Sequence, residues 1–189
     1  WRRHLLAAVW RQAAVEESPG SEAPQVTVGF ADMVGFTAFS RQLDDRDLAG
    51  VVDRFEARVY DHVPQHGGRV VKMIGDEVMF AADRAADAAE IALGLVAAHT
   101  ADPSLPNIRV GLATGPVLPW EGDLFGPTVN LASRLVEAAR PGTILVAPET
   151  AKELESAPAF ALRRMRRVAA KGFGRVRVSG LRRAPTGEA

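Results

Sequence analysis

The chain lacks cysteine altogether, and it lacks an excess of either charge, because 23 acidic residues balance 23 lysines and arginines. The absence of cysteine excludes disulfides, iron–sulfur clusters and thiolate zinc sites, and it fits a reducing compartment. A net charge of zero gives no overall attraction to nucleic acid or to a membrane. Long hydrophobic runs are missing too, since the longest, Ile91–His99, is much shorter than a membrane span.

What remains is an ordinary globular composition, with 47% hydrophobic and 24% charged residues in a chain of 189. That length suits one sizeable domain with its own core. No signal peptide is visible, and the first residue is Trp1 rather than methionine. We therefore expect a fragment or processed form that is cytoplasmic, or a cytoplasmic domain of a larger protein, with no membrane segment of its own.

The N-terminal residues differ from the rest. Residues 1–14 have the pattern of a short amphipathic helix, and residues 16–25 have the composition of a linker. We expect a helix and linker over residues 1–24, one main domain over 25–183 and a flexible tail over 184–189. Two interpretations of the helix stay open: it packs on its own domain, or it ends a connecting helix that leads to an upstream regulatory domain.

From residue 25 onward, strand-like and helix-like segments alternate. The expected helices cover residues 35–43, 45–66, 83–101, 128–139 and 150–156. The expected strands cover residues 25–33, 69–75, 76–82, 107–115 and 143–149, with a hairpin or turn over 116–126 and a final strand pair over 160–167 and 174–181. This order predicts an α+β, ferredoxin-like fold with helices on one face of a mostly antiparallel sheet.

Two aspartates mark the ends of neighbouring strands. Asp32 ends the first strand, and Asp76 lies in the turn of the hairpin VVKMIGDEVMF, which also contains Lys72 and Glu77. In a ferredoxin-like sheet the first strand lies beside this hairpin, so the two carboxylates can converge. Converging acids repel unless a cation lies between them, and oxygen ligands without His or Cys suit Mg²⁺ or Mn²⁺. The pair favours a two-metal phosphoryl or nucleotidyl transfer site, although each aspartate alone could cap a turn.

The segment MVGFT after Asp32 runs from a strand end through a glycine into a helix. Free amide groups at such a turn can bind phosphate oxygens. The segment is not a Walker loop, because the chain contains no G-x-x-x-x-G-K-[ST] motif.

A second group of polar residues lies later in the chain. Asn130 and Arg134 are four residues apart, so they share one helix face while Leu131 and Leu135 take the core side. An arginine there could stabilise charge on a phosphorane, and the alternative is a solvated polar face.

Lys72 and Asp123 offer a donor and an acceptor. Adenine presents an acceptor at N1 beside a donor at N6, and guanine presents the reverse. A Lys–Asp pair therefore suits adenine and opposes guanine, because the wrong base leaves polar groups unpaired. Spacing alone does not show that these two residues meet.

Four segments in this order resemble the motifs of the class III nucleotidyl (adenylyl and guanylyl) cyclase catalytic domain, in a compact bacterial form. They are FADMVGFT (Phe30–Thr37), KMIGDEVMF (Lys72–Phe80), GDLFGPTVNLASR (Gly122–Arg134) and AAKGFGRVRV (Ala169–Val178). The resemblance covers roughly residues 25–181, and it implies that residues 25–183 form a catalytic domain.

The resemblance implies roles for individual residues. Asp32 and Asp76, with the backbone carbonyl of Met33, would bind two Mg²⁺ or Mn²⁺ ions. Lys72 and Asp123 would read the adenine of ATP.

Further roles follow from the same likeness. Asn130 would orient the ribose and Arg134 would stabilise the transition state. Lys171 would touch the triphosphate, and the amides of Val34, Gly35, Phe36 and Thr37 would bind its β- and γ-phosphates. Cyclic AMP and pyrophosphate would be the products.

In this family the active site lies between two subunits, and this chain holds both halves. We therefore expect a head-to-tail homodimer with two shared sites and an inactive monomer. A diguanylate cyclase is disfavoured, because Ile74 and Val78 replace the Gly and Phe of its G-G-D-E-F signature. A guanylyl cyclase would carry Glu and Cys or Ser at positions 72 and 123. A non-catalytic regulatory module would usually have lost a metal aspartate or the Asn–Arg pair.

The C-terminal residues 162–183 hold nine lysines and arginines and no acid. Without an interleaved aromatic platform for stacking bases, this stretch does not indicate nucleic-acid binding. We expect a solvated strand face and no nucleic-acid partner.

Overall fold

The computed structural model describes residues 23–185. Its helices in that range are α2 (Phe36–Ser40), α3 (Asp45–Gln65), α4 (Ala85–Thr100), α5 (Pro127–Ala138) and α6 (Pro148–Leu154). Its strands are β1 (Gln25–Met33), β2 (Gly68–Ile74), β3 (Glu77–Ala82), β4 (Ile108–Pro116), β5 (Leu118–Trp120), β6 (Asp123–Phe125), β7 (Ile144–Val146), β8 (Phe160–Arg164), β9 (Val168–Ala170), β10 (Gly174–Val176) and β11 (Ser179–Arg183). Nearly all of the expected helix and linker over residues 1–24, and the last four residues of the expected tail, lie outside the described residues.

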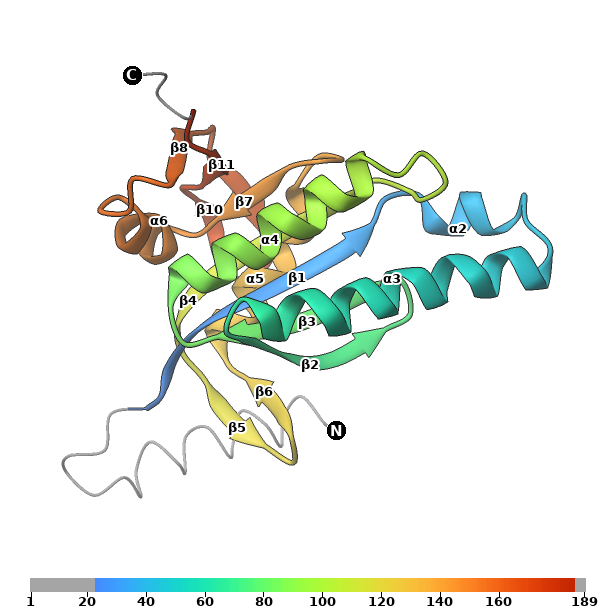
Figure 1. Ribbon diagram of the computed structural model, residues 1–189. Helices are drawn as coiled ribbons and strands as arrows, with labels where there is room; N and C mark the ends of the chain where they lie inside the picture. Colours follow the sequence, from blue (N-terminus) through green and yellow to red (C-terminus); the bar gives the residue numbers. More distant parts are fainter. Residues whose placement is uncertain (1–22, 186–189) are drawn as a thin grey trace.

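Seven strands form one sheet in the order β2-β3-β1-β4-β7-β11-β8 (Figure 1). All neighbours run antiparallel except β4 and β7, which run parallel. The sheet is thus mostly antiparallel, as expected, but it is a mixed one, because the chain passes from β4 to β7 through helix α5, and parallel neighbours need such a crossover. Among the helices of residues 23–185, none combines the length and apolarity needed to cross a bilayer.

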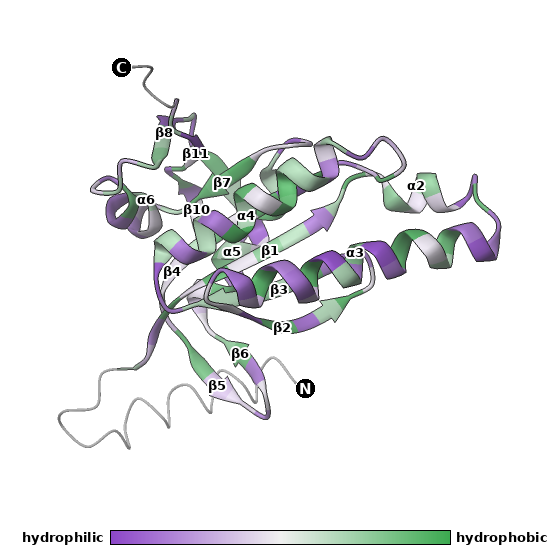
Figure 2. Ribbon diagram, in the orientation of Figure 1, coloured by the Kyte–Doolittle hydropathy of each residue, from purple (hydrophilic) through white to green (hydrophobic). Residues whose placement is uncertain are grey.

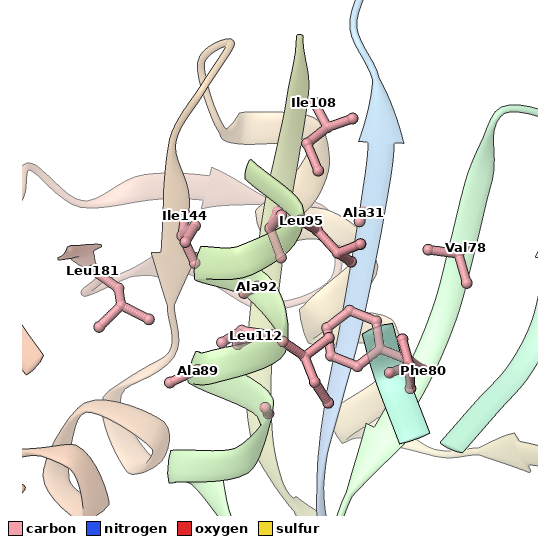
Figure 3. Close-up of a cluster of buried hydrophobic side chains, with 14 of the residues drawn as sticks. Ala31, Val78, Phe80, Ala89, Ala92, Leu95, Ile108, Leu112, Ile144 and Leu181 are labelled. Carbon is pink, nitrogen blue, oxygen red and sulfur yellow. The ribbon is translucent and has the colours of Figure 1, made fainter. Parts of the chain in front are cut away.

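Helices cover both faces of this sheet. On one face, α3 and α4 enclose a core in which Leu95 of α4 clusters with Ala31 and Leu112 (Figure 3). On the other face, Leu135 of α5 clusters with Phe30. The expectation of helices on one face only is wrong, because β1 is apolar on both sides and its six residues 26–31 are all buried.

Helix α3 follows directly from its sequence. The Asp44 side chain accepts a hydrogen bond from the Asp47 amide at 2.8 Å and caps the first turn. Apolar residues then recur every four positions, and Val51, Phe55, Val59 and Val63 are buried. The resulting alternation of hydrophilic and hydrophobic colour along α3 is visible in Figure 2.

The C-terminal strands pair differently from the expectation. The prediction of one final strand pair over residues 160–167 and 174–181 is wrong. Strand β8 pairs with β11, and β9 and β10, which lie between them in sequence, form a separate hairpin. The reason is local: turn glycines with positive φ, Gly172 and Gly174, close the β9–β10 hairpin before the chain rejoins the sheet.

Helix α5 rests on β4 with backbone-to-backbone contact. A Cβ atom added at Gly111 would lie 2.4 Å from the Val136 nitrogen and 2.5 Å from the Ala132 oxygen, so only glycine fits there. This contact sets the height of α5, and of its exposed residues, above the sheet.

Candidate active site

The structure brings Asp32 and Asp76 to the same end of the sheet. Asp32 of β1 is the cross-strand partner of Glu77, the first residue of β3, and the Met33 amide donates to the Asp76 carbonyl at 3.1 Å. Burial raises the pKa of the Asp76 carboxyl, and the nearby charge of Asp32 raises it further. Two carboxylates at the same end of a sheet, with their negative charges close together, form a natural cation site.

Arg109 is a site residue that sequence reasoning missed. It is the cross-strand partner of Asp32 on β4, and its Nε donates to Asp32 Oδ2 at 2.7 Å. Its Nη1 donates to the Glu137 carbonyl of α5 at 3.0 Å, so one guanidinium ties β4, β1 and α5 together. The available signal was a lone arginine in the apolar strand NIRVGLATG, but its partner depends on the β1–β4 register.

Glu77, which the sequence left without a partner, lies half-buried in the same group. Burial, with the charges of Asp32, Asp76 and Glu137, raises the pKa of Glu77 to about 7. Arg109 acts in the opposite direction, but its side chain bonds Asp32, and no ion pair to Glu77 forms within residues 23–185. Negative groups therefore outnumber positive ones at this end of the sheet.

The excess of negative charge and the carboxylate oxygen atoms at this end of the sheet fit a divalent cation. In the part of the chain that the structure describes, however, no three His, Asp or Glu side chains converge to bind a metal. Any metal held by Asp32 and Asp76 would therefore need further oxygen ligands from backbone, water or a phosphorylated substrate.

Lys72 and Asp123 meet, which spacing could not establish. Lys72 Nζ of β2 donates to Asp123 Oδ2 of β6 at 2.5 Å, and Asp123 Oδ1 accepts from the Leu124 amide at 2.8 Å. Both side chains are partly exposed, so the pair is open to a ligand on one side.

Asn130 and Arg134 lie on the outer part of α5, and Leu135 lies on its buried side. Asn130 is exposed, and Arg134 Nη1 donates to Glu137 Oε1 at 2.5 Å. Glu137 thus accepts from Arg134 through its side chain and from Arg109 through its backbone.

These charged groups share one side of the sheet. Along β1 and β4, Ala31, Met33 and Ile108 face the α3–α4 core, so Asp32 and Arg109 face the α5 side. Glu77 pairs with Asp32 and Lys72 pairs with Met79, whose side chain belongs to the α5-side core, so both face the same way.

The turn after β1 offers fewer amides than expected. The Val34 amide donates to the Asn107 carbonyl at 2.8 Å, so it is already engaged. Gly35 adopts the left-handed conformation, with φ of 72°, and no hydrogen bond from the amides of Gly35, Phe36 or Thr37 forms within residues 23–185. Lys171 lies exposed in the β9–β10 turn, away from any ion pair with a described residue.

Fold and site together define a class: an α+β domain whose mixed sheet carries carboxylates and cations on one face. Comparison with known proteins gives the family. Residues 19–181 match the model of the adenylate and guanylate cyclase catalytic domain, and the chain belongs to that family.

Individual relatives agree with this assignment. The chain is 45% identical over 154 residues to an adenylate cyclase of Streptomyces coelicolor, covering 82% of this chain and 40% of the relative. It is 47% identical over 156 residues to an adenylate cyclase of Streptomyces griseus, covering 82% and 39%. The chain thus spans about two fifths of the length of these curated relatives.

A solved structure shares the fold. The catalytic core of a rhodopsin-guanylyl cyclase with converted specificity, in complex with ATPαS, superposes with a TM-score of 0.79 at 25% identity. The match covers 86% of this chain and 98% of that one.

Proposed function

We propose that this chain is the catalytic domain of an adenylate cyclase, which converts ATP to 3′,5′-cyclic AMP and pyrophosphate. The observation that carries the choice of ATP is the Lys72–Asp123 pair, because its donor and acceptor complement N1 and N6 of adenine. The similarity to two adenylate cyclases at 45% and 47% identity supports the same choice.

Asp32, Asp76 and the Met33 carbonyl would hold two Mg²⁺ or Mn²⁺ ions. Such ions, when bound, lower the pKa of the ribose 3′-hydroxyl and neutralise charge on the phosphates. Arg109 keeps Asp32 in place and partly offsets the repulsion among the carboxylates.

The other residues act on ATP itself. Asn130 orients the ribose so that its 3′-oxygen lies in line with the α-phosphorus. The hydroxyl gives its proton to solvent, its oxygen bonds to the α-phosphorus, the bond from the α-phosphorus to the oxygen that bridges it to the β-phosphorus breaks, and pyrophosphate leaves. The Arg134 side chain breaks its hydrogen bond with Glu137 and donates instead to an α-phosphate oxygen, where negative charge builds in the transition state.

The triphosphate needs contacts of its own. The free amides of Gly35, Phe36 and Thr37, with Lys171, are the groups we assign to it. Val34 drops from this set because its amide bonds Asn107.

We assign the active form to a head-to-tail homodimer, with Asp32 and Asp76 from one chain and Lys72, Asp123, Asn130 and Arg134 from the other. Two exposed apolar residues support a second copy: Ile74, 45% exposed, ends β2, and Trp120, 54% exposed, ends β5. The β5–β6 hairpin projects away from the rest of the sheet (Figure 1). Apolar side chains at projecting hairpins are typical of an interface.

The longer relatives support one more proposal, that the natural protein carries a further domain which regulates this one. Cysteine-free composition and the use of ATP fit a cytoplasmic location.

The decisive assay measures cyclic AMP from ATP, with Mg²⁺ or Mn²⁺, across a range of protein concentration. We expect specific activity to rise with concentration as dimers form. No turnover at any concentration with either metal would instead favour a non-catalytic regulatory module.

A further inference from the structure

The C-terminal strands carry cations that lack counter-charges. Residues 160–185 contain nine lysines and arginines and no Asp or Glu. Arg183 bonds Glu90 of α4 through both nitrogens, at 2.7 and 2.6 Å. The other eight form no ion pair with any residue between 23 and 185. Since the whole chain is neutral, the rest of it holds an equal acidic excess, so the charge is strongly segregated.

The strand register places several of these cations on an uncovered face. Leu162 of β8 and Leu181 of β11 are cross-strand partners and face the α4-side core. Arg163 and Arg182, the next residue of each strand, therefore face the opposite side. On that side α5 contacts β1, β4 and β7, whereas β8 is the edge strand of the sheet.

The β9–β10 hairpin continues this face. Val176 and Val178 pack into the α5-side core, so Arg175 and Arg177, which alternate with them, point outward. In Figure 2 the hydrophilic colour of β10 and β11 contrasts with the hydrophobic colour of the neighbouring β7.

Two apolar side chains lie among these arginines. Met165 follows β8, its sulfur lies 3.1 Å from where a Cβ of Gly180 would be, and it remains 47% exposed. Phe173 in the β9–β10 turn is 37% exposed. We use the name basic face for eight exposed residues in and around β8, β10 and β11: Arg163, Met165, Arg166, Arg167, Phe173, Arg175, Arg177 and Arg182.

We propose that the basic face binds the surface of a bilayer that contains anionic phospholipids. Clustered arginines attract anionic headgroups, and exposed methionine and phenylalanine side chains enter the interface between headgroups and acyl chains. Electrostatic attraction of ATP would explain the arginines but not the exposed Met165. Nucleic acid would explain the arginines but not the exposed Met165, and the basic face offers one phenylalanine for base stacking.

The test uses the full chain and sedimentation with vesicles. We compare phosphatidylcholine vesicles with vesicles containing about 30% phosphatidylglycerol, at about 0.1 M salt. We expect binding only to the anionic vesicles. The triple variant Arg163→Gln, Arg166→Gln, Arg167→Gln should bind them about 10²-fold more weakly, because each basic residue near an anionic surface contributes about fivefold.

Each control variant makes the same change in charge or apolarity at a position outside the basic face. The triple variant Arg41→Gln, Arg46→Gln, Arg54→Gln removes the same charge from exposed positions before and within α3, and it should bind as the wild type does within about threefold. Met165→Ser should weaken binding several-fold, whereas Tyr60→Ser, at a residue 53% exposed on α3, should not.

Three results would overturn the proposal. The first is equal binding to neutral and anionic vesicles. The second is an equal loss in both triple variants, which would reflect net charge alone. The third is a fall in kcat/KM for ATP in the basic-face variant without any vesicle binding, which would assign the arginines to the nucleotide.

Discussion

Lys72 and Asp123 are 51 residues apart in sequence, and their side chains meet at 2.5 Å between Nζ and Oδ2. Each therefore satisfies the other before any base arrives. A purine that binds to both side chains must offer an acceptor to Lys72 and a donor to Asp123 at once. Adenine does so through N1 and N6, whereas guanine presents the reverse order.

The first prediction exchanges this pair. Lys72→Glu with Asp123→Cys should lower kcat/KM for ATP by at least ~10²-fold, because both polar contacts to adenine are lost. Use of GTP should rise relative to ATP. The same two exchanges at the exposed residues Lys152 and Asp83 serve as the control. An unchanged ratio of ATP to GTP turnover would contradict the assigned role.

The second prediction concerns the carboxylates. Asp32→Ala should reduce cyclic AMP formation by at least ~10³-fold, because the site loses a metal ligand and Arg109 loses its carboxylate partner. Thermal unfolding should remain cooperative. Asp83→Ala removes an exposed carboxylate beside β3 and should retain full activity. Substantial activity in Asp32→Ala would refute the metal assignment.

The third prediction tests the shared site. Asp32→Ala and Arg134→Ala proteins should each be inactive, and their mixture should recover about a quarter of the wild-type rate. Half of the dimers would then be mixed, and each mixed dimer would hold one intact site of two. Subunit exchange is confirmed separately with differently tagged chains. Exchange without recovered activity would exclude the arrangement.

The fourth prediction follows from the contact between α5 and β4. Gly111→Ala should destabilise the fold by about 1–3 kcal/mol, because the added Cβ meets backbone atoms that no side-chain rotation can relieve. Gly50→Ala is the matched control, since its Cβ meets nothing within 4 Å and alanine favours helix α3. Urea unfolding measures both, and equal stabilities would refute the close contact.

The fifth prediction concerns pH. His99 is buried, its Nδ1 lies 2.9 Å from the Pro106 carbonyl oxygen, and burial lowers its pKa below the ordinary 6.5. The unfolded chain therefore takes up this proton first as the pH falls. The stability that His99 contributes is complete above 6.5 and is lost as the pH falls toward the folded-state pKa.

His99→Gln removes the titrating imidazole and its pH-dependent contribution to stability. The fall in the free energy of unfolding between about pH 7.5 and 5.5 should therefore be less steep in this variant. Glu77 acts in the opposite direction, because its raised pKa of about 7 makes its contribution decline as pH rises through that value. Its contribution is the same in both proteins and cancels in their difference. Parallel pH profiles of wild type and variant would refute the role of His99.

The sequence predicted well wherever the signal was local. The apolar spacing over residues 45–66 predicted α3, and Gly75-Asp76 predicted the turn between β2 and β3. It failed where the answer depended on strands distant in sequence. The partner of Arg109, the meeting of Lys72 with Asp123 and the parallel β4–β7 pair all require the strand order.

The second helical layer was missed for a different reason. A strand that is apolar on both sides, as β1 is over residues 26–31, must be covered twice, but the segment was interpreted as a simple alternation. The amide of Val34 was assigned to phosphate because its partner, Asn107, lies more than seventy positions away in the chain.

The glycine contact at Gly111 has a mechanical consequence. Because α5 packs backbone-on-backbone on β4, and Arg109 of β4 bonds both Asp32 and the Glu137 carbonyl of α5, direct contacts tie β1, β4 and α5 together. In the proposed dimer, this connected group of elements carries Asp32 of one active site and Arg134 of the other. A ligand that displaces a residue in one site would therefore also displace a catalytic residue of the second site. Each chain would in this way couple the two reactions.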